Sequence, residues 1–276
     1  MAITNFIPNV WSENLLNSLD KQYVGVANCN REFEGHIKKC GSSVKICGVG
    51  EISIGDYTKD TDMSNPQALD DNFAELVIDQ AKYFNFQVDD IDKTQCNPKL
   101  LDAAMKNAAA ALANTADSYI YGLYESAGFT KETDLDGGSV IDAILDARRH
   151  LMENGVNDAS DIVIEISPKI ASFLFKEQTD KLSYNNDLNE TGCIGYVAGC
   201  KVFVSNNIFV ERGSYEFDNC YARTTRAIAF AEQLSEVEAY RPEKRFADAV
   251  KGLHLYGAKI VYPNELYCMR FSHKVE

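Results

Sequence analysis

The stretch RFADAVKGLHLYGAKIVYPNEL at residues 245–266 predicts the return strand of a sheet. Aliphatic and aromatic residues dominate Gly252 to Pro263, which is typical of one sheet strand or of two in succession. Gly257 permits a bend, and Pro263 ends the pairing because proline cannot donate to a strand ladder. The stretch AIAFAEQL at residues 227–234 precedes it. Neither stretch carries a catalytic arrangement, so this end of the chain indicates structure rather than reaction.

A long helix is predicted to begin after Asn97-Pro98. Asparagine is a good N-cap, and proline is favoured at the first helical position. Helix-forming residues run from Leu100 to Tyr124, and the pattern ends near Gly128. A helix of ~30 residues spans roughly 45 Å at 1.5 Å per residue. Its many alanines allow close approach by a sheet, so we expect this spine helix to pack against the return strand.

Two extended segments are predicted before the spine helix. Hydrophobic and polar residues alternate over residues 41–57, and Phe84, Phe86 and Val88 alternate with polar neighbours further on. The polar stretch Asp56 to Asp71 lies between them, and long loops in compact domains are usually functional or disordered. We therefore expect a protruding hairpin made of these two strands.

The N-terminal 40 residues show one short amphipathic pattern. Trp11, Leu15, Leu16 and Leu19 fall on one helical face. A helix shorter than ~12–15 residues is marginal on its own in water. This piece is therefore expected to pack against something else, another chain being one candidate.

Residues 137–240 are predicted to form an α/β lobe of ordinary domain size. Ser139 is the expected N-cap of a helix that stops at Asn154-Gly155. The other expected elements are a buried strand at residues 161–166, a helix capped by Ser167-Pro168, a hairpin at residues 192–206 turning at Ala198-Gly199, and a strand near residues 222–230.

Composition narrows the class of protein. The 276 residues include 41 acidic and 27 basic ones, a net charge of −14. Nucleic-acid affinity depends largely on counterion release by Lys and Arg, so direct DNA binding is not expected, although an acidic wall facing DNA is compatible with the charge. No window approaches the roughly 20 apolar residues of a membrane helix, and the start of the chain, broken by Pro8, lacks a secretory-signal pattern. We expect the protein to remain in the cytoplasm where it is made.

The eight cysteines form no C-x-x-C pair, and the four histidines supply no second half of a zinc motif. The cysteines are therefore interpreted as free thiols that pack as small apolar groups in a reducing cell.

Two short motifs are candidate chemical sites. Asp89-Asp90-Ile91-Asp92 could hold Mg²⁺ or Ca²⁺, but the EF-hand pattern is absent and a solvated strand end explains the acids. Gly137-Gly138-Ser139 could hold a phosphate, but it matches neither G-x-x-x-x-G-K-[ST] nor G-x-G-x-x-G, and an ordinary turn with an N-cap is much the better explanation. No catalytic serine or cysteine signature occurs. His150 and His273 have basic neighbours typical of surface residues, and His254 is expected in a half-buried strand. The sequence predicts no enzyme, no cofactor and no metal.

Three arginines of the lobe, Arg212, Arg223 and Arg226, stand among many acidic residues. Solvated surface explains them. The alternative is charge pairing between subunits, which would set the orientation of partners more than their affinity.

The order of these pieces resembles a known family. The segment YFNFQVDDID at residues 83–92 leads into the spine helix at Asn97, and residues 192–206 and 245–266 follow. Together they resemble the major capsid protein of tailed bacteriophages, the Hong Kong 97 shell fold, over nearly the whole chain. The resemblance implies an α+β fold with an N-terminal arm, an extended β-hairpin loop, a peripheral domain with a long spine helix, and an α/β axial domain.

Carried onto this chain, the resemblance implies four regions. Residues 1–40 are the N-terminal arm, residues 41–90 the extended loop, residues 91–136 with 241–276 the peripheral domain, and residues 137–240 the axial domain. Copies would assemble into the hexamers and pentamers of an icosahedral head that encloses double-stranded DNA.

Partners and interface residues follow from the same resemblance. The expected subunit-interface residues are Trp11, Lys45, Asp56, Tyr57, Arg212 and Arg223. No long helical extension for scaffolding precedes the arm, so a separate scaffolding protein, or none, is implied, together with a portal and a decoration protein. Some shells of this fold carry Lys–Asn crosslinks. Lys45, Lys59 and Asn264 match no crosslinking motif, and no crosslink is predicted.

Two other functions stay open at this stage. One is an encapsulin-like nanocompartment, which would enclose a cargo enzyme in a shell of the same fold. The other is a small-molecule or phosphate-transfer α/β enzyme centred on Gly137 to Ser139. The spine helix and the N-terminal arm would have no purpose in such an enzyme, which favours a shell.

Overall fold

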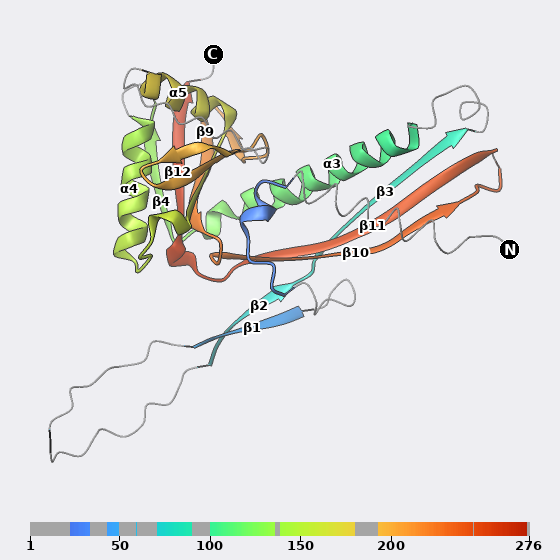
Figure 1. Ribbon diagram of the computed structural model, residues 1–276, viewed down its shortest axis with the longest axis horizontal. Helices are drawn as coiled ribbons and strands as arrows, with labels where there is room; N and C mark the ends of the chain where they lie inside the picture. The colour runs from blue at the N-terminus through green and yellow to red at the C-terminus, as the bar shows by residue number, and fades with distance from the viewer. Residues whose placement is uncertain are drawn as a thin grey trace.

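The computed structural model describes residues 23–33, 43–49, 59, 71–89, 100–135, 139–179, 193–244 and 246–274. In Figure 1 these residues form a lobe at one end, an elongated sheet with a helix along it, and a projecting hairpin. The predicted helix at Trp11 to Leu19, the helix cap at Asn97-Pro98 and the glycines Gly137-Gly138 lie outside the described residues.

The elongated part is a three-stranded antiparallel sheet. Its strands are β10 (Ile228–Tyr240), β11 (Ala247–Ile260) and β3 (Gln80–Asp89), in that order. The return strand predicted from residues 245–266 is therefore largely one long strand, β11, which lies at the centre of this sheet. It ends before the 3₁₀ turn η5 (Pro263–Glu265), as proline predicts.

The spine helix is confirmed as α3 (Leu100–Tyr121), and the 3₁₀ turn η3 (Gly122–Ser126) continues it. One face of α3 is buried, and it consists largely of small and aliphatic residues, namely Ala109, Leu112, Ala113, Ala116 and Ile120. Figure 1 shows α3 lying along the three-stranded sheet. The aromatic ring of Tyr119 meets that of Tyr256 on β11, with their centroids 5.6 Å apart. Alanines on this face allow the close approach that the sequence predicted.

The lobe is built on a seven-stranded mixed sheet with the order β4-β12-β9-β5-β7-β6, and β8 pairs with β9. Its strands are β4 (Phe129–Asp134), β5 (Ile162–Ile166), β6 (Cys193–Val197), β7 (Cys200–Val204), β8 (Val210–Arg212), β9 (Tyr215–Thr224) and β12 (Leu266–Lys274). The helices α4 (Val140–Glu153) and α5 (Pro168–Thr179) and the 3₁₀ turn η4 (Ala159–Asp161) complete it. The sheet takes β4 and β12 from outside residues 137–240, so it does not coincide with the predicted range of the lobe.

Several local predictions in the lobe are confirmed. The Ser139 hydroxyl accepts a hydrogen bond from the Asp142 N–H and caps α4. Gly155, with φ of 98°, follows the end of α4. The β6–β7 hairpin turns at Ala198 and Gly199, whose φ values are 53° and 82°. Positive φ at both central residues is the geometry that two-residue hairpins prefer.

The predicted pairing of the projecting hairpin is wrong. Strand β1 (Ser43–Val49) pairs with β2 (Asp71–Val77), not with the strand that carries Phe84 and Phe86. That strand is β3, which pairs with β11 in the elongated sheet. The hairpin has its own small apolar cluster, including Ile46 and Leu76, against β10 and β11. The chain therefore changes sheets between β2 and β3.

The single strand expected near residues 222–230 is also wrong. β9 ends at Thr224 and β10 begins at Ile228, and the two strands belong to different sheets. A turn closed by the hydrogen bond from Ala227 N–H to Thr224 O, 3.2 Å, separates them. Thr225 and Arg226 in the turn are exposed, and the residues on both sides of them are buried.

The histidine interpretations also need correction. His254 is buried rather than half-buried, and His273, expected at the surface, is buried as well. Lys169 Nζ lies 3.0 Å from His273 Nδ1.

Four cysteines of the described part, Cys29, Cys200, Cys220 and Cys268, are free and buried, as expected of small apolar groups. Within the described residues, no helix is long and apolar enough to cross a membrane.

Candidate subunit-interface surfaces and a buried polar junction

The six residues proposed as interface residues do not gather at one place. Lys45 is exposed on β1, opposite Glu75 of β2. Arg212 is 82% exposed at the end of β8 in the lobe, and its Nε is 4.0 Å from Glu216 Oε1. Trp11, Asp56 and Tyr57 lie outside the described residues. Lys45 and Arg212 therefore occupy two separate parts of the molecule (Figure 1).

The expectation that Arg223 lies at a subunit interface on the surface is wrong, because this residue is buried. Its side chain and that of Glu165 are both fully buried. Arg223 Nε and Nη2 donate to the two Glu165 carboxylate oxygens over 3.0 and 2.9 Å. The remaining donors bind the carbonyl oxygens of Gly25 and Asn28 at 2.8 and 2.7 Å. Arg223 thus acts within the chain and holds the N-terminal segment on the lobe.

We call residues 23–31 the junction segment. It contains the 3₁₀ turn η1 (Val26–Asn28). The segment pairs with β10 through hydrogen bonds from Asn30 N–H to Ile228 O and from Phe230 N–H to Asn30 O, both 2.9 Å. Asn28 Nδ2 donates to Glu165 at 3.1 Å. Figure 1 shows η1, in blue, where α3, the lobe and the elongated sheet meet.

Asp117 of α3 binds the junction segment through hydrogen bonds. Its two carboxylate oxygens accept hydrogen bonds from the N–H groups of Val24, 3.0 Å, and Val26, 2.9 Å. Burial raises the pKa of Asp117 to about 6, and these backbone hydrogen bonds oppose the rise. Gly25 lies so close that a Cβ atom there would be 3.1 Å from the Tyr121 ring.

Glu232 of β10, in the elongated sheet, also binds the junction segment. Tyr23 Oη donates to it over 2.5 Å and Arg31 Nη2 over 2.6 Å. His254 Nε2 of β11 lies 2.8 Å from the same carboxylate. Burial works to raise the pKa of Glu232, but the hydrogen bonds from His254 and Tyr23 outweigh it and lower the pKa.

Sequence reasoning missed this buried polar junction. Its partners are far apart along the chain, and Gly25 and Arg223 are 198 positions apart. The available signal was Asp117, an acid on the apolar face of an alanine-rich helix. A buried acid needs partners, so it points to a buried polar contact even when the partners are unknown.

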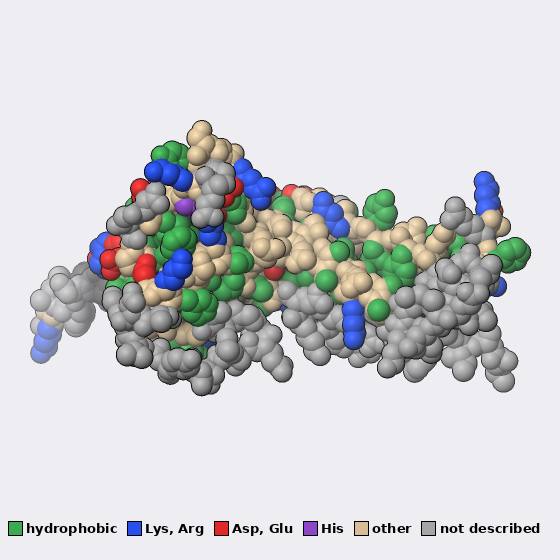
Figure 2. All heavy atoms as spheres, turned by 90° about the horizontal axis from the view of Figure 1, so that it is seen from above, with side chains coloured by type: hydrophobic (Ala, Val, Ile, Leu, Met, Phe, Trp, Pro, Cys, Tyr) green, Lys and Arg blue, Asp and Glu red, His purple; other side chains and the backbone are tan. Residues whose placement is uncertain are grey.

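The outer surface carries exposed hydrophobic side chains on both parts. Figure 2 shows them along the elongated part as well as on the lobe. The exposed large ones include Tyr83, Phe129, Phe175, Tyr196, Tyr215, Tyr240 and Phe246. Tyr83 of β3 and Phe246, just before β11, are 80% and 85% exposed. Exposed aromatic residues of this kind are enriched at protein interfaces.

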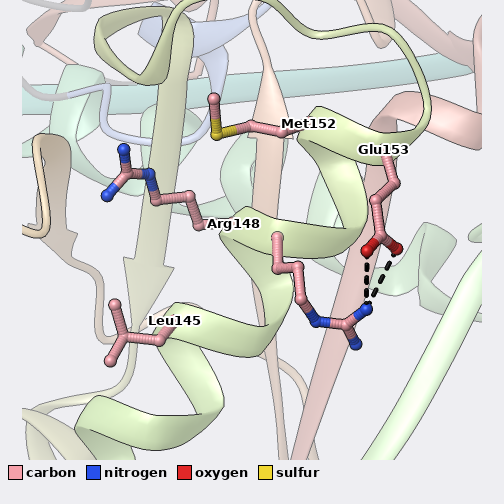
Figure 3. Close-up of a pocket in the computed structure, with 5 residues that line it drawn as sticks. Leu145, Arg148, Met152 and Glu153 are labelled. Atoms are coloured by element: carbon pink, nitrogen blue, oxygen red, sulfur yellow. Dashed lines mark hydrogen bonds and ion pairs between the residues drawn. The ribbon is translucent and has the colours of Figure 1, made fainter.

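Another such surface lies on α4. Leu145, Arg148 and Met152 line a shallow depression with Arg149 and Glu153 (Figure 3). Leu145 and Met152 are each about two-fifths exposed. Arg149 and Glu153 form an ion pair of 2.8 Å at its edge. Within the described residues no cluster of His, Cys, Asp or Glu could hold a metal ion.

Comparison with known proteins identifies the fold. No protein-family model and no curated protein matches the chain. A solved structure from Mycobacterium phage Che8 is 28% identical over 90% of this chain and 91% of its own, with a TM-score of 0.68. The capsid structure of the Cyanophage P-SCSP1u is 14% identical, covers 84% of each chain and has a TM-score of 0.65.

The chain has the fold of a tailed-phage major capsid protein.

The capsid fold extends to a virus-like particle from Pyrococcus furiosus, whose crystal structure is 13% identical to this chain. The match covers 96% of this chain and 99% of that chain, with a TM-score of 0.57. The capsid fold therefore accounts for both the lobe and the elongated sheet, and the predicted α+β class is confirmed.

Proposed function

We propose that this chain is the major capsid protein of a tailed bacteriophage, whose copies assemble into the hexamers and pentamers of an icosahedral head. The observation that carries the proposal is the similarity to the Mycobacterium phage Che8 structure over 90% of the chain. Exposed aromatic side chains on both parts of the molecule support assembly, because burying them requires a neighbour. The role is structural, and no enzyme activity is proposed.

The four regions are proposed to act as in the resemblance described above. Residues 1–40 reach neighbouring subunits, and residues 41–90 lie across an adjacent subunit. Residues 91–136 with 241–276 form a peripheral domain, and residues 137–240 an axial domain at the centres of hexamers and pentamers. The projecting β1–β2 hairpin supports an extended loop within residues 41–90. Lys45 and Arg212, both exposed, remain proposed interface residues, as do Trp11, Asp56 and Tyr57.

The other partners are proposals too. The shell encloses double-stranded DNA without sequence-specific binding, which suits a net charge of −14. A scaffolding protein, a portal and a decoration protein act with it during assembly in the bacterial cytoplasm, and the product is part of the virion.

Assembly itself is the direct test. Purified protein, with and without its scaffolding protein, is expected to form closed particles that electron microscopy and light scattering detect. Protein that stays monomeric under both conditions would contradict the proposal.

A second candidate is a cargo-enclosing nanocompartment, which the similarity to the Pyrococcus furiosus virus-like particle favours. Mass spectrometry of purified particles and extraction of their nucleic acid separate the two. Packaged DNA supports the phage head, and an encapsulated enzyme supports the compartment.

The aromatic surface predicts a variant that folds but assembles poorly. Phe246→Ser removes a ring that is 85% exposed, so the free energy of unfolding is expected to change by less than ~0.5 kcal/mol. Loss of an interface aromatic costs ~2 kcal/mol or more at a hot spot, so the protein concentration needed for assembly should rise at least ~10-fold. Light scattering against concentration measures this. Phe246→Tyr keeps the ring and should assemble normally, whereas normal assembly of Phe246→Ser would remove this surface from the interface.

A further inference from the structure

The junction segment, residues 23–31, is bonded to three parts of the fold. On one side it meets α3 through Asp117. On another it meets the lobe through Arg223 and Glu165. It also meets the elongated sheet through Glu232. One short segment therefore links all three where they meet (Figure 1).

We propose that the junction segment is a clasp, which holds the lobe on the elongated sheet and can open as a unit, and that proton uptake by Asp117 closes it.

Opening is feasible because only three side chains of the segment, Tyr23, Val26 and Cys29, are buried in the main hydrophobic cluster, and its other bonds are polar. The N–H groups of Val24 and Val26 leave Asp117, and Arg223 loses two carbonyl acceptors but keeps both bonds to Glu165. Water replaces the lost partners, so each hydrogen bond contributes far less than its full strength. The bridge between Asn30 and Ala229 is isolated rather than part of a strand ladder. The larger cores of the lobe and sheet need not open with the clasp.

Closing is linked to protonation of Asp117. Burial in the closed clasp raises the pKa of this carboxyl group to about 6. Released into water, it has an ordinary pKa of ~3.9. A group whose pKa is higher in the closed state takes up a proton on closing, so falling pH favours closure. The stabilisation is fully present below pH ~3.9 and is lost as pH rises from there through 6. Two pKa units correspond to a ~100-fold change in the closing equilibrium over the whole range, of which about 10-fold falls between pH 5 and pH 8.

Other titratable and charged groups face the clasp from every element packed against it. They are Tyr121 of α3, Glu165 of β5, Arg223 of β9, Glu232 of β10, His254 of β11, and Tyr23, Cys29 and Arg31 in the segment itself. Burial raises the pKa of Tyr23 and Tyr121 and raises that of Cys29 to about 11, so these groups stay neutral between pH 5 and 8. Histidine is the residue type that ordinarily titrates in this range, so His254 needs its own variant.

Cys29 provides the probe. Its side chain is buried in the clasp, with Sγ 3.2 Å from Gly25 O. The full chain is labelled with N-ethylmaleimide between pH 5 and 8, and peptide mass spectrometry follows Cys29. Each rate is divided by that of the urea-unfolded chain at the same pH, which removes the thiol's own pH dependence. Cys220, buried in the lobe sheet, reports global unfolding in the same sample.

The normalised Cys29 rate is expected to exceed that of Cys220 and to rise up to ~10-fold from pH 5 to pH 8. Asp117→Asn should flatten this profile. Asp142→Asn removes an exposed carboxylate from α4 and should leave it unchanged. His254→Gln should also leave it unchanged.

Three results would overturn the clasp. Equal normalised rates for Cys29 and Cys220 would mean that the segment opens only with the whole fold. A flat wild-type profile would remove the proton linkage. A profile that His254→Gln flattens would assign the linkage to the histidine. The last two readings need only the wild type and His254→Gln, so they decide the matter even if Asp117→Asn does not fold. The measurement reads a single chain and is independent of assembly into a shell.

Discussion

Arg223→Met is expected to lower the free energy of unfolding by about 3–5 kcal/mol. The substitution removes the guanidinium but leaves the Glu165 carboxylate buried without its bidentate partner. It also strips the carbonyl oxygens of Gly25 and Asn28 of their donors. An uncompensated buried charge is among the most destabilising changes a single substitution can make. Urea unfolding of the full chain, followed by circular dichroism, measures the effect.

Two matched variants separate burial from charge. Arg212→Met removes the same charge from a side chain that is 82% exposed, and it should change stability by less than ~0.5 kcal/mol. The double variant Arg223→Met with Glu165→Leu removes both charges, so it should recover much of the loss. A loss below ~1 kcal/mol for Arg223→Met would show that the buried pair does not stabilise the lobe.

Local sequence signals predicted the lobe well where the backbone itself decides. The helix cap at Ser139 and the hairpin turn at Ala198-Gly199 were predicted correctly, because a cap and a turn each depend on a few adjacent residues. The spine helix was also predictable, since capping, alanine content and length all agreed. The overall order of elements then sufficed for the resemblance to a capsid protein, which the solved structures support.

Sequence reasoning failed where two buried segments follow one another. The change of sheet after Thr224 is marked only by the short polar run Arg223 to Arg226, with buried residues on both sides, so the sequence pattern predicts one strand there. The hairpin was misassigned for a related reason, since β2 and β3 are separated only by Ile78 and Asp79. Arg223 was read as a surface residue because arginine is rarely buried, and its partners lie far away in sequence.

Gly257→Ala is expected to destabilise the fold by about 3 kcal/mol, near the upper end of the usual cost of overpacking. The sequence suggested that Gly257 eases a bend, but β11 pairs with β10 without a register shift at this position. Gly257 instead allows the backbone of residues 77–78 to approach β11 closely. A Cβ atom there would lie 2.2 Å from Val77 O and 3.1 Å from Ile78 Cα. These are backbone atoms at the point where the chain leaves the hairpin for the elongated sheet, so they cannot rotate away.

Alanine variants of two other glycines provide comparisons for the loss of stability. At Gly252 a new Cβ would meet the Phe84 ring at 2.3 Å, and a side chain can shift more readily than backbone, so Gly252→Ala should cost less than Gly257→Ala. Gly122 has nothing within 4 Å, and Gly122→Ala should change stability by less than ~1 kcal/mol. Thermal and urea unfolding of the three variants give the order directly.

Because the 77–78 backbone also sets where the hairpin departs, Gly257→Ala should impair particle assembly more than its loss of stability alone explains. If Gly257→Ala were as stable as Gly122→Ala, the hairpin would not be held against β11 at this point.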